Sequence, residues 1–426
     1  MRTKSARICE LSANNPGMVF NQLMHHFHKG NLENWYQLLK RKAAVGIDGI
    51  TKETYGENLQ GNLESLVQKM KSMSYLPGPV RQTLIPKEGK SGFTRPLGIG
   101  KLVDKIVQKG VQKVLEAIYE PLFLRCSFGF RTNLSCHNAI KALRNYLCKN
   151  PVRVIIDLDL SNYFGTIDHG LLLEILSDKI KDKRFLRYIR RMLKAGILSE
   201  GELRVSDEGV PQGSVCSPIL ANIYAHHVLD EWFEGTVKRY CRGKVELFRY
   251  ADDAVICCEK AKDAERIKIA LIKRLTKYKL KLNEDKTKLL NFNVFERSNK
   301  ASFDFLGFTF YLGSNRRGRT VPKLKSCGKK LRVKLTKVNL WCKHNRSKAP
   351  LRELWKNFCS KLRGHIQYYS VSYNYRAVHN FVKRSLNIFL KWLNRRSQKK
   401  SMNYDQFEQY RRRFPPPPIK ICHALF

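Results

Sequence analysis

Two short apolar runs, residues 245–248 and 254–258, flank a polar interruption in the second half of the chain. Apolar runs of this length on either side of a tight turn predict a β-hairpin. The turn would carry the adjacent carboxylates of Asp252 and Asp253. Aspartate is common in turns because its side chain bonds the nearby backbone, so the pair alone indicates only a solvated turn.

A third apolar run, residues 152–160, alternates with period two. This period places Asp157 and Asp159 on one face of the predicted strand and a row of apolar residues on the other. Further strands are expected at residues 80–85 and 280–283.

Apolar residues with helical spacing occupy much of the remaining chain. The predicted helices lie at residues 104–118, 137–148, 220–233, 263–278, 329–343, 350–370 and 375–396. Residues 18–75 are expected to form helices interrupted by a turn at 46–49. From residue 152 onward the order is strand, helix, hairpin, helix, strand, which is that of a split βαβ, ferredoxin-like sheet. The apolar tail after the prolines at 415–418 is expected to dock back onto the protein.

Charge points to a polyanionic partner. The 426 residues contain 80 lysines and arginines against 36 acidic residues, a net charge of +44, which favours nucleic acid as the partner. The charge is concentrated: residues 321–426 hold 26 basic and 3 acidic residues. This composition predicts a separate basic module at the C-terminus.

The sequence lacks the usual marks of export or membrane insertion. No apolar run reaches 18 residues, and no apolar segment follows the basic N-terminus. Glu10 counts against a mitochondrial presequence. The 12 cysteines show no paired C-x-x-C spacing, so neither a zinc site nor a disulfide framework is indicated. A reducing, cytoplasmic location is therefore expected.

The predicted sheet supplies partners for the two turn carboxylates. In a split βαβ sheet the strand that ends at Asp159 lies beside the hairpin that carries Asp252 and Asp253. Three carboxylates in this arrangement could hold two Mg²⁺ ions, with Mn²⁺ as an alternative, about 3.5–4 Å apart for in-line phosphoryl transfer. Asp157 lies two residues further along the strand, and a capping role stays open for it.

Several ordered motifs extend this pattern. They are Asp-Leu-Ser-Asn-Tyr-Phe at 159–164, Gly-Val-Pro-Gln-Gly-Ser at 209–214, Tyr-Ala-Asp-Asp at 250–253, Asn-Glu-Asp-Lys-Thr at 283–287 and Phe-Leu-Gly-Phe at 305–308. Their order resembles a bacterial group II intron reverse transcriptase/maturase. Motifs at 85–98 and 127–131 are similar to that family's fingers, and Leu-Arg-Gly-His-Ile-Gln-Tyr-Tyr at 362–369 is similar to its thumb. The similarity runs from about residue 46 to the end of the chain.

The resemblance implies a role for each matching residue. Asp159, Asp252 and Asp253 match the catalytic, metal-binding carboxylates, and Lys286 matches a lysine that protonates the leaving pyrophosphate. The positions that match substrate-binding residues are Lys87, Arg95, Phe164, Gln212 and Gly213. Those that match nucleic-acid-binding residues are Arg131, Leu306, Gly307 and Arg363.

Among these, Phe164 would exclude a ribose 2′-hydroxyl by steric clash, while Lys87 and Arg95 would clamp the triphosphate of the nucleotide. Simpler interpretations stay open at this point. In so basic a chain Lys87 and Arg95 could be general phosphate contacts, and one of Tyr163 and Phe164 must point into the core.

The resemblance also implies an α+β right-hand polymerase, with fingers and a ferredoxin-like palm followed by a helical thumb. Residues 1–75 would form an N-terminal helical extension and the start of the fingers, and residues 76–312 the fingers and palm. Residues 313–426 would form the RNA-binding thumb, called maturase domain X, with no endonuclease domain after it.

The implied function is RNA-directed DNA synthesis by an intron-encoded protein that also binds its intron RNA and assists splicing and mobility. Its partners would be intron RNA as template, a DNA primer, dNTPs and target DNA; no membrane partner is expected, and homodimerisation is left open. A free-standing reverse transcriptase in host defence is one alternative. A splicing-only RNA-binding maturase is another, although the intact Asp159, Asp252 and Asp253 argue against it.

Overall fold

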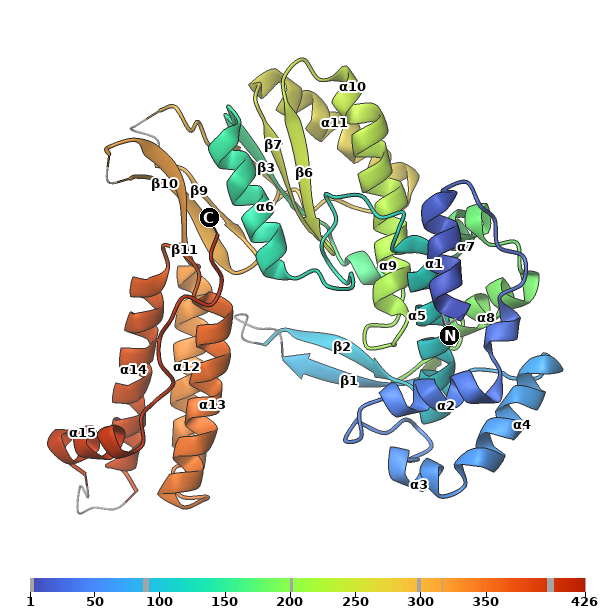
Figure 1. Ribbon diagram of the computed structural model, residues 1–426, viewed down its shortest axis with the longest axis horizontal. Helices are drawn as coiled ribbons and strands as arrows, with labels where there is room; N and C mark the ends of the chain where they lie inside the picture. The colour runs from blue at the N-terminus through green and yellow to red at the C-terminus, as the bar shows by residue number, and fades with distance from the viewer. Residues whose placement is uncertain are drawn as a thin grey trace. The chain divides into compact units, whose positions relative to one another are not determined.

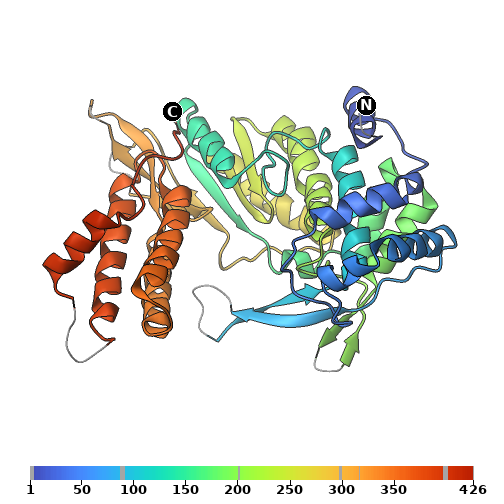
Figure 2. The ribbon, with the colours of Figure 1, turned by 60° about the horizontal axis from the view of Figure 1, so that its bottom comes forward.

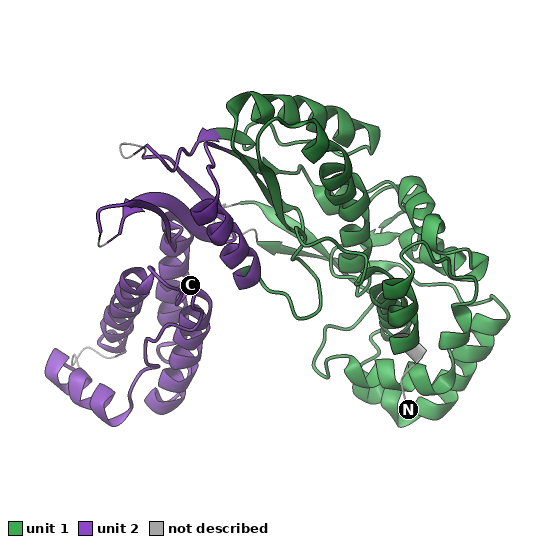
Figure 3. Cartoon of the chain, turned by 45° about the horizontal axis from the view of Figure 1, so that its top comes forward, with its two compact units in different colours: residues 1–87, 92–136, 155–289 green, residues 88–91, 137–154, 290–426 purple. Residues whose placement is uncertain are grey.

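The computed structural model describes residues 4–86, 92–199, 202–296, 300–315, 317–396 and 402–425. Over these residues it is a mixed α+β structure. The chain forms two compact units (Figure 3). Unit 1 comprises residues 1–87, 92–136 and 155–289, and unit 2 comprises residues 88–91, 137–154 and 290–426. Among the helices of the described residues, none is both long and apolar enough to span a membrane.

In unit 1, α1 (Lys4–Asn14) and α2 (Lys29–Leu38) pack against α5 (Leu102–Tyr119). Apolar residues at helical spacing, among them Val107, Val111 and Ile118, are buried along its length. A Cβ at Gly110 would collide with the ring of Trp35 on α2, so the glycine permits the close approach of the two helices. The helices of this part are α1 (Lys4–Asn14), α2 (Lys29–Leu38), α3 (Lys52–Glu57), α4 (Leu59–Lys71), α5, α7 (His169–Lys179) and α8 (Lys183–Leu193).

The carboxylate of Asp182 fixes the start of α8. It accepts hydrogen bonds from the backbone N–H groups of Arg184 and Phe185, which satisfies donors that the first helical turn leaves without partners. Its second oxygen accepts from the N–H of Leu23, 2.7 Å away. One buried side chain therefore caps a helix and anchors the N-terminal segment to it.

A first sheet in unit 1 has the strand order β2-β1-β4-β5. β1 and β2 form an antiparallel hairpin in which Ile85 lies opposite Arg95, and β4 runs parallel to β1 (Figure 2). The strands are β1 (Val80–Pro86), β2 (Thr94–Ile99), β4 (Ile197–Ser199) and β5 (Glu202–Arg204). β1 confirms the strand predicted at 80–85, whereas the three-residue strands β4 and β5 were not predicted.

The second sheet has the order β6-β7-β3-β8, so β3 lies beside the β6–β7 hairpin as the sequence predicts (Figure 1). Its strands are β3 (Val154–Asp159), β6 (Val245–Tyr250), β7 (Asp253–Cys258) and β8 (Lys288–Asn291). Two helical segments flank the β6–β7 hairpin in sequence. Before it, α9 (Ser217–Ala225) continues in π-helical turns at His226–Glu231 and Phe233–Val237 and in α10 (Lys238–Tyr240), and after it comes α11 (Ala261–Lys277).

Two details of this sheet differ from the sequence-based expectation. The strand predicted at 280–283 is wrong: Leu282 forms only an isolated bridge with Leu160, and the outer strand is β8 instead. The apolar alternation predicted for β3 holds only at its end, because both Ile155 and Ile156 are fully buried. A strand with neighbours on both sides and both faces covered loses its period-two pattern.

Unit 2 combines a sheet with a group of helices. Its sheet has the order β11-β10-β9, with β9 (Ser302–Phe305), β10 (Phe308–Ser314) and β11 (Thr320–Ser326). The helices predicted at 329–343, 350–370 and 375–396 are confirmed as α12 (Gly328–Asn345), α13 (Leu351–Tyr369) and α14 (Tyr375–Leu393). Among the described residues, unit 2 has two further helices, α6 (Cys136–Lys149) and α15 (Tyr404–Arg413).

The boundary predicted between residues 312 and 313 lies inside β10, which pairs with β9 on one side and β11 on the other. The compact units divide this part of the chain between residues 289 and 290, and the domain boundaries drawn from the sequence stay a prediction.

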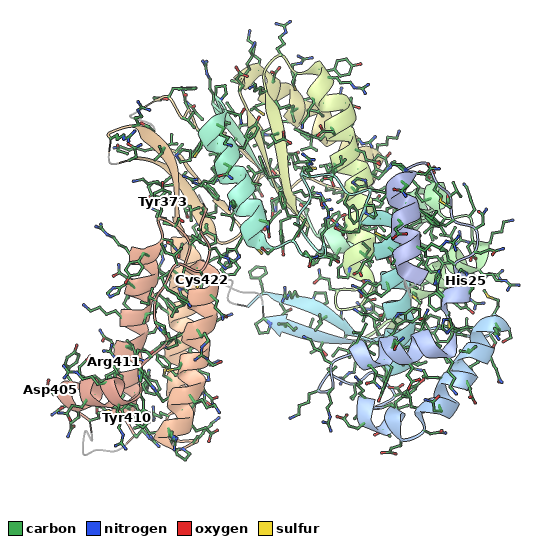
Figure 4. The ribbon with its side chains drawn as sticks, in the orientation of Figure 1. His25, Tyr373, Asp405, Tyr410, Arg411 and Cys422 are labelled. Carbon is green, nitrogen blue, oxygen red and sulfur yellow. The ribbon has the colours of Figure 1, made fainter. Side chains whose placement is uncertain are left out.

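The C-terminal segment returns to α13, as expected for an apolar tail. His423 forms a parallel bridge with Val371, and the N–H of Cys422 donates to the carbonyl oxygen of Ser370 at 2.8 Å. Figure 4 labels Cys422 on this returning segment and Tyr373 in the turn between α13 and α14. The tail is thus part of the packing of unit 2.

Candidate active site

The β6–β7 hairpin presents an aspartate in a two-residue turn. Tyr250 lies opposite Asp253, so Ala251 and Asp252 form the turn between the strands. Ala251 has a left-handed backbone, with φ of +58°, a conformation that costs a non-glycine residue free energy. Asp252 is half-buried, whereas Asp253 begins β7 and is exposed.

Asp159 ends β3, the strand next to β7. The segment after α11 encloses this strand end: Asn283 N–H donates to the carbonyl oxygen of Asp159 at 2.8 Å, and Lys286 Nζ forms an ion pair with Asp159 Oδ2. The N–H of Asp159 donates to Thr287 Oγ1 at 3.4 Å. Lys286 is therefore placed beside one of the predicted metal ligands.

Asp159 and Asp252 interact electrostatically. Burial raises the pKa of Asp252, and the negative charge of Asp159 raises it further. A cation placed against both carboxylates would offset both effects, so the oxygen donors present fit a hard divalent ion. Over the described parts of the chain, no three acidic, histidine or cysteine side chains converge as a preformed metal cluster.

The two aromatic residues after Asp159 point in different directions. Tyr163 is buried, and its hydroxyl donates to the carbonyl oxygen of Ala221 on α9 at 2.5 Å. Phe164 is only half-buried, and its ring meets the Phe130 ring edge to face at 6.2 Å between centroids. The inward aromatic is therefore Tyr163, which leaves Phe164 at the surface next to the strand end.

The loop with Gln212 and Gly213 packs against β2. The N–H of Gly98 donates to the carbonyl oxygen of Gln212 at 2.6 Å. Gly213 has φ of +104°, and a Cβ there would lie 2.5 Å from the carbonyl oxygen of Gly98. Only glycine fits this position without displacement of the backbone.

A cavity of about 200 Å³ lies beside this loop. The segment after Asp159 lines it through Asn162 and Gly165, the loop through Gln212, and the β1–β2 hairpin through Gln82 and Gly98. All of these residues belong to unit 1. The cavity thus joins three of the motifs that the sequence singled out.

The remaining predicted residues of unit 1 are placed as follows. Arg95 is exposed on β2, and Lys87 lies outside the described residues. Arg131 is only 12% exposed: its guanidinium pairs with Glu120 at 2.9 Å and donates to the carbonyl oxygens of Leu124 and Ser127. This placement favours support of the 124–131 loop, and a contact of Arg131 with nucleic acid stays a prediction.

Leu306 and Gly307 form the turn between β9 and β10 in unit 2, with φ of +48° and +86°. The hydroxyl of Tyr368 on α13 donates to the carbonyl oxygen of Leu306 at 2.7 Å. Arg363 is exposed on the same helix. Leu306, Gly307 and Arg363 all belong to unit 2.

One group of buried polar residues was missed from the sequence. It centres on Arg249, which lies between the apolar Phe248 and the tyrosine of the Tyr-Ala-Asp-Asp motif. A charged residue inside an apolar strand is a signal that could have been noticed. The side chains that bind it lie 19 to 122 residues away in sequence and could not have been named.

Comparison with known proteins agrees with the motif order. The family described as reverse transcriptase (RNA-dependent DNA polymerase) matches residues 85–310. Protein YkfC of Escherichia coli is 33% identical over 320 residues, which are 66% of this chain and 81% of YkfC. The group II intron-encoded protein LtrA of Lactococcus lactis is 34% identical over 223 residues, 52% of this chain and 37% of LtrA.

A 91 kDa protein in the cob intron of Schizosaccharomyces pombe is 38% identical over 226 residues, 52% of this chain. The chain spans only 27% of that protein's length. Relatives of this kind thus come from bacteria and from fungi, and several extend well beyond the part that matches.

Proposed function

Because the chain belongs to the reverse transcriptase (RNA-dependent DNA polymerase) family, we propose that it synthesises DNA on an RNA template at the Asp159–Asp252 pair. The observation that carries the proposal is the position of these carboxylates: Asp159 ends β3, and Asp252 lies in the turn immediately before the neighbouring strand β7. Burial and the nearby charge of Asp159 both raise the pKa of Asp252, and a bound divalent cation would offset both effects.

The family depends on divalent metal ions, and we assign Mg²⁺ to Asp159, Asp252 and Asp253. When bound, such ions activate the attacking 3′-hydroxyl and neutralise the leaving pyrophosphate. The protein's own part is to hold the carboxylates at adjacent strand ends. Lys286 Nζ, beside Asp159, donates a proton toward the leaving group.

Other residues select and orient the substrates. Phe164 faces the sugar of the dNTP and clashes with a ribose 2′-hydroxyl, while Arg95 and Lys87 bind its triphosphate. Gln212 and Gly213 line the path of the template beside the 200 Å³ cavity. The hydrogen bond between Gly98 and Gln212 supports this role, since it ties the loop to the strand that carries Arg95.

In the same proposal, residues 76–312 supply the fingers and palm, and residues 313–426 form the thumb and bind intron RNA as a maturase. The concentration of basic residues after position 321 supports RNA binding, and the printed name of LtrA supports an intron-encoded protein. The bacterial subgroup stays a proposal, because the relatives include fungal proteins. A free-standing reverse transcriptase in host defence is the second candidate. The matched residues cover 81% of YkfC, and the name of that relative does not mention an intron.

Primer extension on an RNA template with dNTPs and Mg²⁺ tests the polymerase assignment. Asp252→Asn and Asp159→Asn are expected to abolish extension, because each removes a ligand charge from the pair. Asp285→Asn is the matched control, since it removes one exposed charge from the residue next to Lys286. Full extension by Asp252→Asn would show that the chemistry lies elsewhere.

RNA binding is tested separately with the full chain. The logarithm of the affinity for a structured intron RNA is expected to fall linearly with the logarithm of the salt concentration. Arg363→Gln should reduce this slope by about 1 if the exposed side chain contacts a phosphate. An affinity that does not change with salt would contradict the maturase part of the proposal.

A further inference from the structure

The side chain of Arg249 is 0% exposed, and all five of its N–H donors have acceptors. Nε and Nη2 bind the two carboxylate oxygens of Asp230 at 2.7 and 2.5 Å. Nη1 donates to Asn222 Oδ1 at 2.9 Å and to the carbonyl oxygen of Ala251 at 3.1 Å, and Nη2 also donates to Ser127 Oγ at 2.7 Å. One guanidinium therefore joins four segments of unit 1.

Both members of the ion pair are charged in the folded protein. Burial, the largest single influence, would raise the pKa of Asp230, but the charge and hydrogen bonds of Arg249 together with those of His226 hold that pKa below its ordinary value. A buried ion pair is weak evidence for stability, since apolar side chains of similar volume are often as good. The number of directed bonds, one of them to the turn, indicates a geometric role instead.

The main chain of Arg249 is fixed as well. Its N–H donates to the carbonyl oxygen of Cys126 at 2.8 Å, and its carbonyl oxygen accepts from the N–H of Phe128 at 2.9 Å. The next residue of that loop is Gly129, where a Cβ would collide with the backbone nitrogen of Ala251. The 126–129 loop thus packs directly against the backbone of the Ala251 turn.

Ala251 is the residue that needs this support. Its left-handed backbone is unfavourable for alanine, and it immediately precedes Asp252. A change in its φ and ψ angles would rotate the peptide plane before Asp252 and redirect that carboxylate.

We propose that the Arg249–Asp230 pair positions the Asp252 carboxylate by holding the carbonyl oxygen of Ala251. Arg249 is a positioning residue, because the guanidinium acts through the turn. The inference rests on the proposed function only for the role of Asp252.

The test compares Arg249→Lys with Asp263→Asn. A lysine keeps the charge for Asp230 but offers three donors from one point, so it cannot reach all five acceptor atoms. Asp263 is also buried and also supports β6, but at its other end, where Oδ2 accepts from the N–H groups of Arg242 and Gly243. Each variant is studied as the full chain at the same interval below its own melting temperature.

The first readout is hydrogen exchange of the peptide that contains residues 250–253, which requires no activity. Arg249→Lys is expected to accelerate exchange in this peptide at least tenfold relative to Asp263→Asn, on the order of the effect of one lost hydrogen bond. The second readout is single-nucleotide incorporation. There kcat should fall by about 10²-fold, the effect of roughly 1 Å of misplacement, with the KM for dNTP within about twofold of the parent.

Equal exchange at residues 250–253 in the two variants would overturn the proposal, as would a kcat of Arg249→Lys equal to that of Asp263→Asn. If Arg249→Lys does not fold, Asp230→Asn takes its place, with the same expected and overturning results. Failure of the proposed function would give a different result, namely polymerase activity that survives in Asp252→Asn. In that case hydrogen exchange at residues 250–253 still decides whether Arg249 holds the turn.

Discussion

Lys286 Nζ and Asp159 Oδ2 form an ion pair that joins positions 127 residues apart in sequence. The lysine side chain is 53% exposed, and exposed pairs of this kind contribute only about 0–1 kcal/mol to stability. The pair is therefore better explained by chemistry at the strand end than by the stability of the fold.

Lys286→Arg separates the two roles that a lysine could have there. An arginine keeps the positive charge beside Asp159, but it does not release a proton in the accessible pH range. We expect kcat for nucleotide incorporation to fall by about 10²-fold, the lower range for loss of general acid catalysis. Pre-steady-state kinetics on the parent and on Lys286→Gln complete the comparison. An arginine variant as fast as the parent would mean that Lys286 only orients Asp159.

Asp159→Asn should lower the pKa of Asp252 in the metal-free protein. Removal of the neighbouring negative charge eliminates one cause of the raised pKa, but burial, the largest cause, remains. The pKa should therefore move toward the ordinary value of aspartate without reaching it. Carboxyl carbon NMR of aspartate-labelled protein measures this, with Asp285→Asn as the control that should leave the titration of Asp252 unchanged.

The same carboxylate predicts a pH dependence for cation binding. Protonated Asp252 is a poor ligand, and its raised pKa moves the loss of the ligand to higher pH than for an ordinary aspartate. The increase in melting temperature on addition of Mg²⁺ or Mn²⁺ should thus be large at pH 7.5 and diminish as the solution is made acidic through the pKa of Asp252. An increase in Asp252→Asn as large as in the parent would locate the cation elsewhere.

Phe164→Ala should relax the choice between dNTP and rNTP. Loss of the half-exposed ring removes the steric clash with a 2′-hydroxyl, and the ratio of kcat/KM values should fall by about 10- to 200-fold. Tyr163→Phe is the matched control: it removes the hydroxyl that bonds to Ala221, which affects stability by about 0.5–1.5 kcal/mol, and leaves sugar selection intact. If Phe164→Ala leaves the selection of dNTP over rNTP unchanged, Phe164 has only a packing role.

Gly213→Ala should reduce polymerisation more than it reduces stability. The new Cβ would lie 2.5 Å from the carbonyl oxygen of Gly98, so the loop must move away from β2. Gly49→Ala is the control, since Gly49 also has positive φ but has open space around its Cβ position. Thermal melts and primer extension on both variants decide the matter, and equal activity would mean that the loop tolerates the displacement.

The sequence predicted the elements that carry the carboxylates because their signals are local. Apolar runs on both sides of a tight turn defined β6 and β7, and a buried strand defined β3. Their adjacency followed from the order of elements in a known sheet topology. The sequence alone could not predict that Asp252 lies in the turn while Asp253 begins β7, because this division depends on the left-handed backbone of Ala251.

Interactions between distant residues account for what was missed. The partners of Arg249 come from three other segments, and no periodicity links Ser127 or Asp230 to it. The strand expected at 280–283 fails for a related reason: the left-handed backbone of Lys279 turns the chain after α11, and Leu282 meets its neighbour at one position only. The ion pair of Arg131 with Glu120, 11 residues earlier, was likewise not predicted, and the contact of Arg131 with nucleic acid stays a prediction.

The hydrogen bond from Tyr368 to the carbonyl oxygen of Leu306 has a mechanical consequence. It couples the β9–β10 turn to the last turn of α13, and the close packing of Gly307 against Tyr369 leaves little slack between them. The turn is therefore expected to move together with the C-terminal end of α13. A nucleic-acid strand bound at that turn, as the proposed function has it, would then be displaced together with α13, without a separate motion of the β9–β10 hairpin.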